Sequence, residues 1–198
     1  VTGVNWTVSI MALKIGDAYG VSTAAAIQAI DYAVQMGATL SSNSWGGPGY
    51  SQALRDAIDA AGDAGQLFIA SAGNSGQNND AIPSYPSSYT LPNIISVAAT
   101  DENDQLANFS CYGPTSVDVA APGVNIYSTT PTNSYQYSSG TSMAGPHVAG
   151  MAALLQANRP NASSQEIKNM LMASADPKGS LAGRMVTGGR VTLDGAIQ

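Results

Sequence analysis

The segment SSGTSMAGPHVAG, residues 138–150, places Ser142 five residues before His147, which is the single histidine of the chain. A serine hydroxyl becomes a useful nucleophile when a neighbouring base, usually a histidine, takes its proton. The first question is therefore whether His147 is the base for Ser142. If it is not, the chain contains no histidine that could be.

Helix geometry argues against this pairing. Both residues fall in the apolar stretch 141–157, for which the sequence predicts one long helix. Five residues turn a helix by about 500°, so His147 points about 140° away from Ser142. We therefore expect His147 to be a packed, hydrogen-bonded residue of this helix and not the base.

Ser142 itself lies in the first turn of the predicted helix. Unpaired backbone N–H groups and the positive end of the helix dipole favour a developing negative charge at that place. The position suits a nucleophile, but it also suits a serine that merely caps the helix. The helical pattern alone leaves both interpretations open.

Short apolar runs alternate with helical patterns along the chain, which indicates an α/β domain with a mostly parallel sheet. In such a sheet the ligand site lies beyond the carboxyl ends of the strands. Predicted strands cover residues 8–15, 38–45, 66–72, 93–100 and 116–122. The 198 residues contain no linker, so we expect one domain.

Four predicted helices connect or follow these strands, and each has a recognisable start or apolar pattern. The first covers residues 24–36, with Thr23 as its cap and Gly37 at its end. The second begins at Ser51 and buries Leu54, Ile58 and Ala61. The last two cover residues 141–157 and 165–173, the latter behind a capping box of Ser163 and Glu166.

The composition excludes several classes of protein. The net charge of −6 argues against a nucleic-acid partner, which selects for basic faces. No apolar run approaches the roughly 18 residues of a membrane span. Cys111 is the single cysteine, so no intrachain disulfide can form. Because Val1 is preceded by neither an initiator Met nor a leader, we expect a mature or excised segment.

Four stretches occur in the order found in subtilisin-like serine proteases: NSWGG (43–47), ASAGNSG (70–76), ANFSCYGPTSVDVAAPG (107–123) and SSGTSMAGPHVAG. GTSMAGPHVAG resembles the nucleophile signature of that family, and SAGN resembles the segment with its oxyanion-hole asparagine. The resemblance runs from about Val4 to the C-terminus. It implies a subtilisin-like three-layer α/β fold, a mostly parallel sheet flanked by helices, that lacks the N-terminal strands. Residues 1–198 would then be the C-terminal part of a single peptidase domain.

The resemblance assigns roles residue by residue. Ser142 matches the nucleophile that attacks the peptide carbonyl, and Asn74 matches the side-chain donor of the oxyanion hole. A turn asparagine before Gly76 is the alternative for Asn74. A pocket would receive the side chain before the scissile bond. One wall would come from Ser44, Trp45 and Gly46, the second wall from Ala72 and Gly73, and the floor from Ser84. Trp45 equally suits core packing, and residues 17–20 resemble the edge that pairs with the substrate backbone.

The catalytic aspartate and histidine of the family precede the serine, and their motifs are absent from this sequence. The resemblance implies that they lie upstream of Val1, and that the strand with the aspartate fills a slot between residues 8–15 and 39–44. Without it, two apolar strand edges stay unpaired. We therefore expect an upstream segment of the same domain, or a second chain in its place, to be a partner, and the chain alone to be inactive.

No cofactor is expected for the chemistry, and no metal ligand is predicted in this chain. The main calcium loop of the family belongs to the absent part. A weaker structural calcium site near residues 83–89 has no carboxylate cluster to support it.

Three functional hypotheses follow. The first is a secreted serine endopeptidase that hydrolyses polypeptides, with neither nucleic acid nor membrane as a partner. The second is a catalytically incomplete scaffold of the same family that binds peptides without cleaving them. The third pairs Cys111 with His147 as a thiol protease, for which no supporting context exists. Ser142 and Asn74 favour the first, because a pure binder needs neither, and the sequence upstream of Val1 would discriminate the first two.

Overall fold

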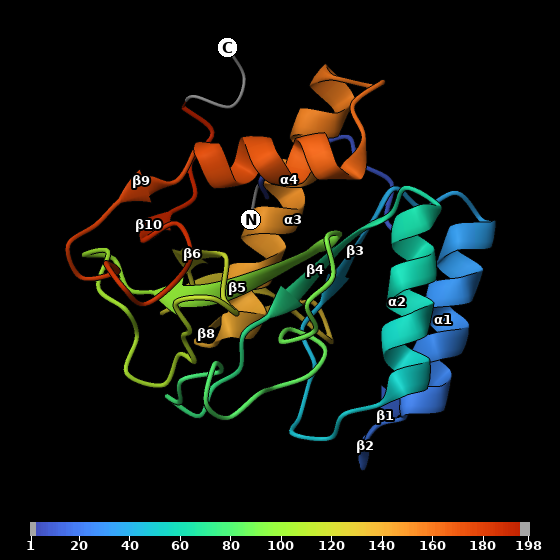
Figure 1. Cartoon of the computed structure of the whole chain (residues 1–198), viewed down its shortest axis with the longest axis horizontal. Helices are drawn as coiled ribbons and strands as arrows, with labels where there is room; N and C mark the ends of the chain where they lie inside the picture. Colours follow the sequence, from blue (N-terminus) through green and yellow to red (C-terminus); the bar gives the residue numbers. More distant parts are fainter. Residues whose placement is uncertain (1–2, 195–198) are drawn as a thin grey trace.

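The computed structural model describes residues 3–194, which form three layers with a six-stranded sheet in the middle (Figure 1). The strands follow the order β3-β4-β5-β6-β10-β9, and the first five run parallel while β9 is antiparallel to β10. Their bounds are β3 Leu40–Asn43, β4 Leu67–Ser71, β5 Ile94–Thr100, β6 Val119–Pro122, β9 Asp176–Pro177 and β10 Gly189–Arg190. The predicted α/β class with a mostly parallel sheet is confirmed.

The helices cover both faces of the sheet, and the alternation of side chains along β4 shows why. Leu67 and Ile69 pack in one apolar cluster with two helices, α3 and α4, whereas Phe68 and Ala70 pack in another cluster with α1 and α2. The helix bounds are α1 Thr23–Gln35, α2 Gln52–Asp63, α3 Thr141–Asn158 and α4 Ser164–Ala173. Because β4 is buried on both faces, its first four residues are all apolar.

The predicted helix ends agree with the structure to within one residue. Ser22, not Thr23, caps α1, because the Ser22 hydroxyl accepts a hydrogen bond from the Ala25 N–H at 3.3 Å. Thr23 is instead the first helical residue. Gly37 lies just after the helix with φ +75°, a left-handed conformation that glycine adopts without strain, and so it ends α1 as predicted.

The starts of α2 and α4 follow the sequence pattern directly. Ser51 caps α2 through a hydrogen bond from the Leu54 N–H at 3.3 Å. At α4, the Ser163 hydroxyl and the Glu166 carboxylate each accept a backbone N–H from the other residue, which is a complete capping box. Two short polar signals therefore position the helices on opposite faces of the sheet.

The predicted strand at residues 8–15 is wrong, since this segment is irregular and mostly exposed. Trp6 and Ile10, on or next to it, are 79% and 87% exposed. A strand needs a neighbour for its backbone N–H and C=O groups, and residues 3–194 provide none at this place. A hollow of about 1250 Å³ lies instead between this segment, α1, β3 and one side of α3.

Two small antiparallel pairs stand apart from the main sheet. β1 Gly16–Asp17 pairs with β2 Gly20–Val21, and β7 Ile126–Thr130 pairs with β8 Ser134–Ser138. The second hairpin was not predicted. Three residues, 131–133, join the strands, and Thr132 and Asn133 among them have φ +68° and +54°, in the left-handed region.

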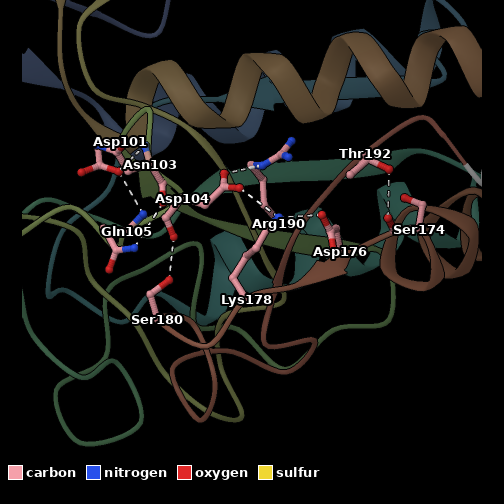
Figure 2. A network of polar contacts seen from close by, with 10 residues as sticks. All are labelled: Asp101, Asn103, Asp104, Gln105, Ser174, Asp176, Lys178, Ser180, Arg190 and Thr192. Atoms are coloured by element: carbon pink, nitrogen blue, oxygen red, sulfur yellow. Dashed lines mark hydrogen bonds and ion pairs between the residues drawn. The ribbon is translucent and has the colours of Figure 1, made fainter.

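Charged pairs stabilise the edge of the sheet formed by β9 and β10 (Figure 2). The Asp104 carboxylate accepts hydrogen bonds from Lys178, at 3.1 Å, and from the Nε of Arg190. Lys178 also contacts Asp176 at 2.7 Å, and the Ser180 hydroxyl donates to the Asp104 carbonyl oxygen at 2.6 Å. These contacts hold the C-terminal segment with β9 and β10 against the loop that follows β5.

Candidate active site

Ser142 lies in the first turn of α3, where the helix meets the carboxyl end of β3. The Ser142 Oγ is 3.5 Å from the Ser44 carbonyl oxygen, and the Ser44 hydroxyl donates to the Ser142 carbonyl oxygen at 3.1 Å. α3 begins at Thr141, and Gly140 before it is the N-cap. The hydroxyl therefore lies at the positive end of the helix dipole, at the edge of the sheet where the ligand site was expected.

Asn74 comes to the same place from the loop after β4. Its Oδ1 accepts hydrogen bonds from the backbone N–H and from the hydroxyl of Thr141, both at 2.9 Å. The backbone N–H can only donate, so the amide is fixed with its oxygen toward α3. The Asn74 Nδ2 is left as a donor next to the helix start, since it would lie 3.5 Å from a Cβ placed on Gly140.

Thr141 is a site residue that the sequence analysis missed. Besides holding Asn74, its hydroxyl accepts the Gly73 N–H at 3.2 Å, and its carbonyl oxygen accepts the Ser71 hydroxyl at 2.8 Å. The side chain is buried and joins the end of β4 to the start of α3. Its only signal in the sequence was its place directly before Ser142.

The second wall and the floor of the predicted pocket adjoin each other. Gly73 has φ +112°, and a Cβ there would lie 3.1 Å from the Cys111 Sγ and 3.5 Å from the Ser84 Oγ. Ala72, the preceding residue, is fully buried. A side chain at Gly73 would both strain the backbone and fill the space toward Ser84.

The first wall is tied to the floor by backbone hydrogen bonds. The Gly47 N–H donates to the Tyr85 carbonyl oxygen at 2.9 Å, and the Tyr85 N–H donates to the Gly47 carbonyl oxygen at 2.7 Å. A Cβ on Gly46 would lie 2.8 Å from the Tyr85 carbonyl oxygen, so only glycine allows this approach. Residues 44–47 and Ser84 thus belong to one connected unit.

Trp45 points partly into the core. Its side chain packs against the apolar cluster of α1 and α2, and its Nε1 donates to the Asn43 Oδ1 at 3.2 Å. These contacts support the packing alternative for this side chain. Any contribution of residue 45 to the pocket wall rests on its backbone.

His147 is hydrogen-bonded within its own helix, as expected. Its Nδ1 lies 2.8 Å from the Met143 carbonyl oxygen, so the proton resides on Nδ1. The residue is half-buried and not part of the fully buried core. Cys111 has a different partner, because its Sγ lies 3.1 Å from the Ser75 Oγ and is buried. The structure thus gives no support to a pair of Cys111 and His147.

Charged groups with clearly shifted pKa values lie away from these residues. Burial raises the pKa of Asp118, although the Lys168 ammonium lies 3.6 Å from it. Within residues 3–194, no group of three or more His, Cys, Asp or Glu side chains is placed to hold a metal ion. Calcium binding near residues 83–89 stays an expectation. The described site contains a hydroxyl, an amide donor and a group of adjoining small residues, and no histidine or carboxylate is among them.

A model of the subtilase family matches residues 1–189. Thermitase from Thermoactinomyces vulgaris is 43% identical over 191 residues, which are 96% of this chain and 65% of that protein. Subtilisin DY from Bacillus licheniformis is 41% identical over 177 residues, which are 88% of this chain and 64% of that protein. The chain thus spans slightly less than two thirds of the length of these curated relatives.

A solved structure gives the same result for the fold. The structure of the prenylagaramide maturation protease PagA superposes with a TM-score of 0.81 at 30% sequence identity. The match covers 93% of this chain and 70% of the PagA chain. The expected subtilisin-like layering of helices around a parallel sheet is therefore confirmed.

Proposed function

The chain belongs to the subtilase family of serine peptidases, and on that premise we propose that it carries the nucleophile half of a serine endopeptidase. The Ser142 hydroxyl gives its proton to the base of the complete enzyme and attacks the carbonyl carbon of a peptide bond. The C–N bond then breaks, the amine half leaves with that proton, and water hydrolyses the acyl-enzyme to the free acid and Ser142. The observation that carries the proposal is the anchored amide of Asn74. Its oxygen accepts both hydrogen bonds from Thr141, and its Nδ2, beside the first turn of α3, has no hydrogen-bond partner within residues 3–194.

Two donors stabilise the oxyanion in this proposal, the Asn74 Nδ2 and the backbone N–H of Ser142. Donors fixed before the reaction stabilise the charge that develops in the transition state without having to reorganise. Thr141 is a positioning residue, because it sets the direction of the Asn74 amide from two atoms of its own. The dipole of α3 adds to the same effect.

The pocket before the scissile bond accepts an uncharged side chain of medium to large size. Its proposed walls and floor are small and uncharged: Ser44, Gly46, Ala72, Gly73 and Ser84. The absence of a side chain at Gly73 leaves room toward Ser84, where a Cβ would otherwise lie 3.5 Å from the Ser84 Oγ. A lysine or arginine in the substrate would find no carboxylate among these residues.

The base for Ser142 comes from outside this sequence in the proposed enzyme. The only histidine, His147, lies five residues after Ser142 on α3, and its Nδ1 is hydrogen-bonded to the Met143 carbonyl oxygen. The hollow beside β3 supports a partner that adds a strand there, because β3 is an edge strand and the hollow has an apolar lining. We place the aspartate and histidine on that partner, either an upstream segment of the same domain or a second chain.

The proposed partners and location follow from family and charge. A polypeptide is the substrate, and the net charge of −6 disfavours nucleic acid. None of the helices within residues 3–194 is long and apolar enough to cross a membrane. On family membership we place the enzyme outside the cell.

A peptide-binding scaffold without catalysis is the second candidate function. It is favoured by one observation, namely that β3 has an open edge while, within residues 3–194, no histidine or carboxylate lies among the site residues and His147 is bonded to Met143. The anchored Asn74 amide argues for the enzyme, because a binder has no oxyanion to stabilise. Aspartate and histidine motifs in the gene upstream of Val1 would favour the enzyme, and their absence would favour the binder.

Asn74→Leu in the complete protease tests the proposal. Loss of one oxyanion donor lowers kcat by about a hundred- to a thousandfold, a size established on this same family, with little change in KM. Asn103→Ala, in an exposed turn far along the chain, is the control and should leave kcat unchanged. A raised KM with an unchanged kcat for Asn74→Leu would mean that Asn74 only binds the substrate, and would contradict the proposal.

A further inference from the structure

Three exposed tyrosines form a cluster on one face of the hairpin β7–β8. Tyr127, Tyr135 and Tyr137 are 48%, 51% and 68% exposed. Tyr127 directly faces Tyr137 in the hairpin, and Tyr135 lies two residues from Tyr137, so all three side chains share a face. Their rings pack against each other, with centroids 4.9 Å apart for Tyr127 and Tyr137 and 5.8 Å for Tyr127 and Tyr135.

The three tyrosines of the cluster do not pack in the apolar core. The hairpin is a separate two-stranded sheet, and none of the three tyrosines belongs to a core cluster within residues 3–194. Residues 119–158 include no Asp, Glu, Lys or Arg, so the face is aromatic and uncharged. Tyrosines among Ser, Thr, Asn and Gln are the composition of surfaces that bind other polypeptides, because the rings give rigid contact area.

The hairpin leads directly into the candidate nucleophile. Its base is closed by the Gly140 N–H, which donates to the Gly123 carbonyl oxygen at 2.8 Å, and by the Asn125 N–H, which donates to the Ser139 Oγ at 2.9 Å. α3 with Ser142 begins immediately afterwards. Five residues separate Tyr137 from Ser142, so their Cα atoms are at most about 18 Å apart, which is the reach of a short extended peptide.

The pocket before the scissile bond uses other segments, namely residues 44–47, 72–74 and 84–85. The hairpin contributes to none of its walls. It is therefore available to the other half of the substrate, the residues that follow the scissile bond and leave first.

We propose that Tyr127, Tyr135 and Tyr137 form a platform that binds the substrate segment after the scissile bond, with a preference for aromatic and proline residues. The inference rests on the proposed function, because Ser142 fixes where the bond lies. Aromatic and proline rings stack on exposed tyrosines. Charged residues find no countercharge in residues 119–158, and acidic ones also meet the net charge of −6.

The test compares two substrates of the complete protease. One is a peptide anilide that ends at the scissile bond, and the other is the same peptide continued by six residues that include Phe and Pro. Replacing all three tyrosines by Ser should lower kcat/KM about tenfold for the continued peptide and leave the anilide within about twofold, because only the former reaches the platform. Tyr137→Phe keeps the ring and should keep most of the preference.

Tyr32→Ser is the matched control, because Tyr32 on α1 is 48% exposed, like Tyr127. It should not change the ratio of the two substrates. A second readout uses the Ser142→Ala variant as a background without cleavage. In it, the triple replacement should weaken binding of the labelled continued peptide about tenfold.

Equal losses on both substrates would overturn the platform, because the hairpin would then merely support Ser142. Unchanged kinetics and unchanged peptide binding would overturn it as well. Failure of the proposed function is a different result, namely anilide hydrolysis that survives Ser142→Ala. The binding measurement does not depend on hydrolysis, so it decides about the platform in that case too.

Discussion

The two edges of the central sheet, at β9 and at β3, have different surroundings. Beyond β6, the strands β10 and β9 continue the sheet, and the charged pairs around Asp104 fasten the C-terminal segment to the loop after β5 (Figure 2). At the other edge, β3 pairs with β4 on one side only; no strand within residues 3–194 pairs with its outer side, and an apolar hollow lies there. An open edge over an apolar surface is a template for another strand.

The same division applies to the candidate active site. Its oxyanion half is held by hydrogen bonds within the chain, from Asn74 through Thr141 to Gly73 and Ser71. The half that must take the proton from Ser142 lies on the side of the open edge in our proposal. In this proposal the chain holds its share of the site in order and takes the rest from a partner.

The largest expected effect is on kcat, through Ser142 in the half of the site that the chain itself holds in order. In the complete protease, Ser142→Ala should lower kcat by about 10⁶-fold, the size known for the nucleophile of this family. His147→Ala should change kcat little and lower the melting temperature, because it loses a hydrogen bond to Met143 and some packing. Steady-state kinetics and thermal unfolding of both variants separate the two. Loss of kcat in His147→Ala with an unchanged melting temperature would contradict the assigned roles.

The middle of the sheet, where β5 and β6 begin, should be sensitive to one buried charge. Lys168 donates to the Ile94 carbonyl oxygen and lies 3.6 Å from Asp118, and both side chains are largely buried. Lys168→Met leaves the Asp118 carboxylate without its partner, so the free energy of unfolding should fall by about 3–5 kcal/mol. Arg55→Met is the control, because the exposed pair of Arg55 and Asp59 contributes about 1 kcal/mol at most. Similar losses in denaturant unfolding of both variants would contradict this ranking.

A smaller effect is expected for the preference among side chains before the scissile bond. Because the proposed pocket lacks a charged residue, peptides with Leu, Met or Phe before the scissile bond should exceed those with Lys or Arg by at least about tenfold in kcat/KM. A peptide library assayed with the complete enzyme measures this ratio. A dominant preference for Lys or Arg would show that a carboxylate reaches the pocket from elsewhere.

The smallest expected effect is the pH dependence of the Asp104 contacts. Burial alone would raise the pKa of Asp104, but hydrogen bonds from Lys178 and Arg190 hold it below its usual range. The folded-state pKa is lower than the unfolded one, so these contacts stabilise the protein above about pH 4 and lose their effect as the pH falls through the lowered pKa. Asp104→Asn should therefore be less stable than wild type at pH 6, with a gap that narrows toward pH 3.

Asparagine suits this test because Asp104 has φ +58°, which asparagine also tolerates. Urea unfolding at several pH values gives the gap directly. A gap that is constant from pH 6 to pH 3 would mean that the charge of Asp104 does not matter.

The sequence predicted well those elements whose signals are local. Ser51 before Leu54, Ile58 and Ala61 defined α2, and the capping box of Ser163 and Glu166 defined α4. The apolar run 66–72 became β4, because its two faces meet helices on both sides. Motif order predicted where Ser142 and Asn74 would meet.

The errors have physical causes outside the local pattern. Residues 8–15 have a strand pattern, but a strand forms only with a neighbour, and the described residues offer none there. Thr141 was missed because its role depends on contacts with residues 71–74, which the motif does not reveal. The hairpin β7–β8 depends on positive φ values at Thr132 and Asn133. These two residue types are a weaker signal of such a turn than a glycine would be.

The central claim is that the chain holds an ordered nucleophile half without a base, and labelling of Ser142 by a fluorophosphonate tests it most directly. The isolated 198-residue chain should react slowly, and adding a segment that carries the family's aspartate and histidine should accelerate labelling by about a hundredfold or more, since a positioned base contributes about 10²–10⁴-fold. The melting temperature should rise together with the labelling rate, because the same segment completes the β3 edge. Rapid labelling of the isolated chain that disappears in Ser142→Ala would show a base within it and would contradict the account.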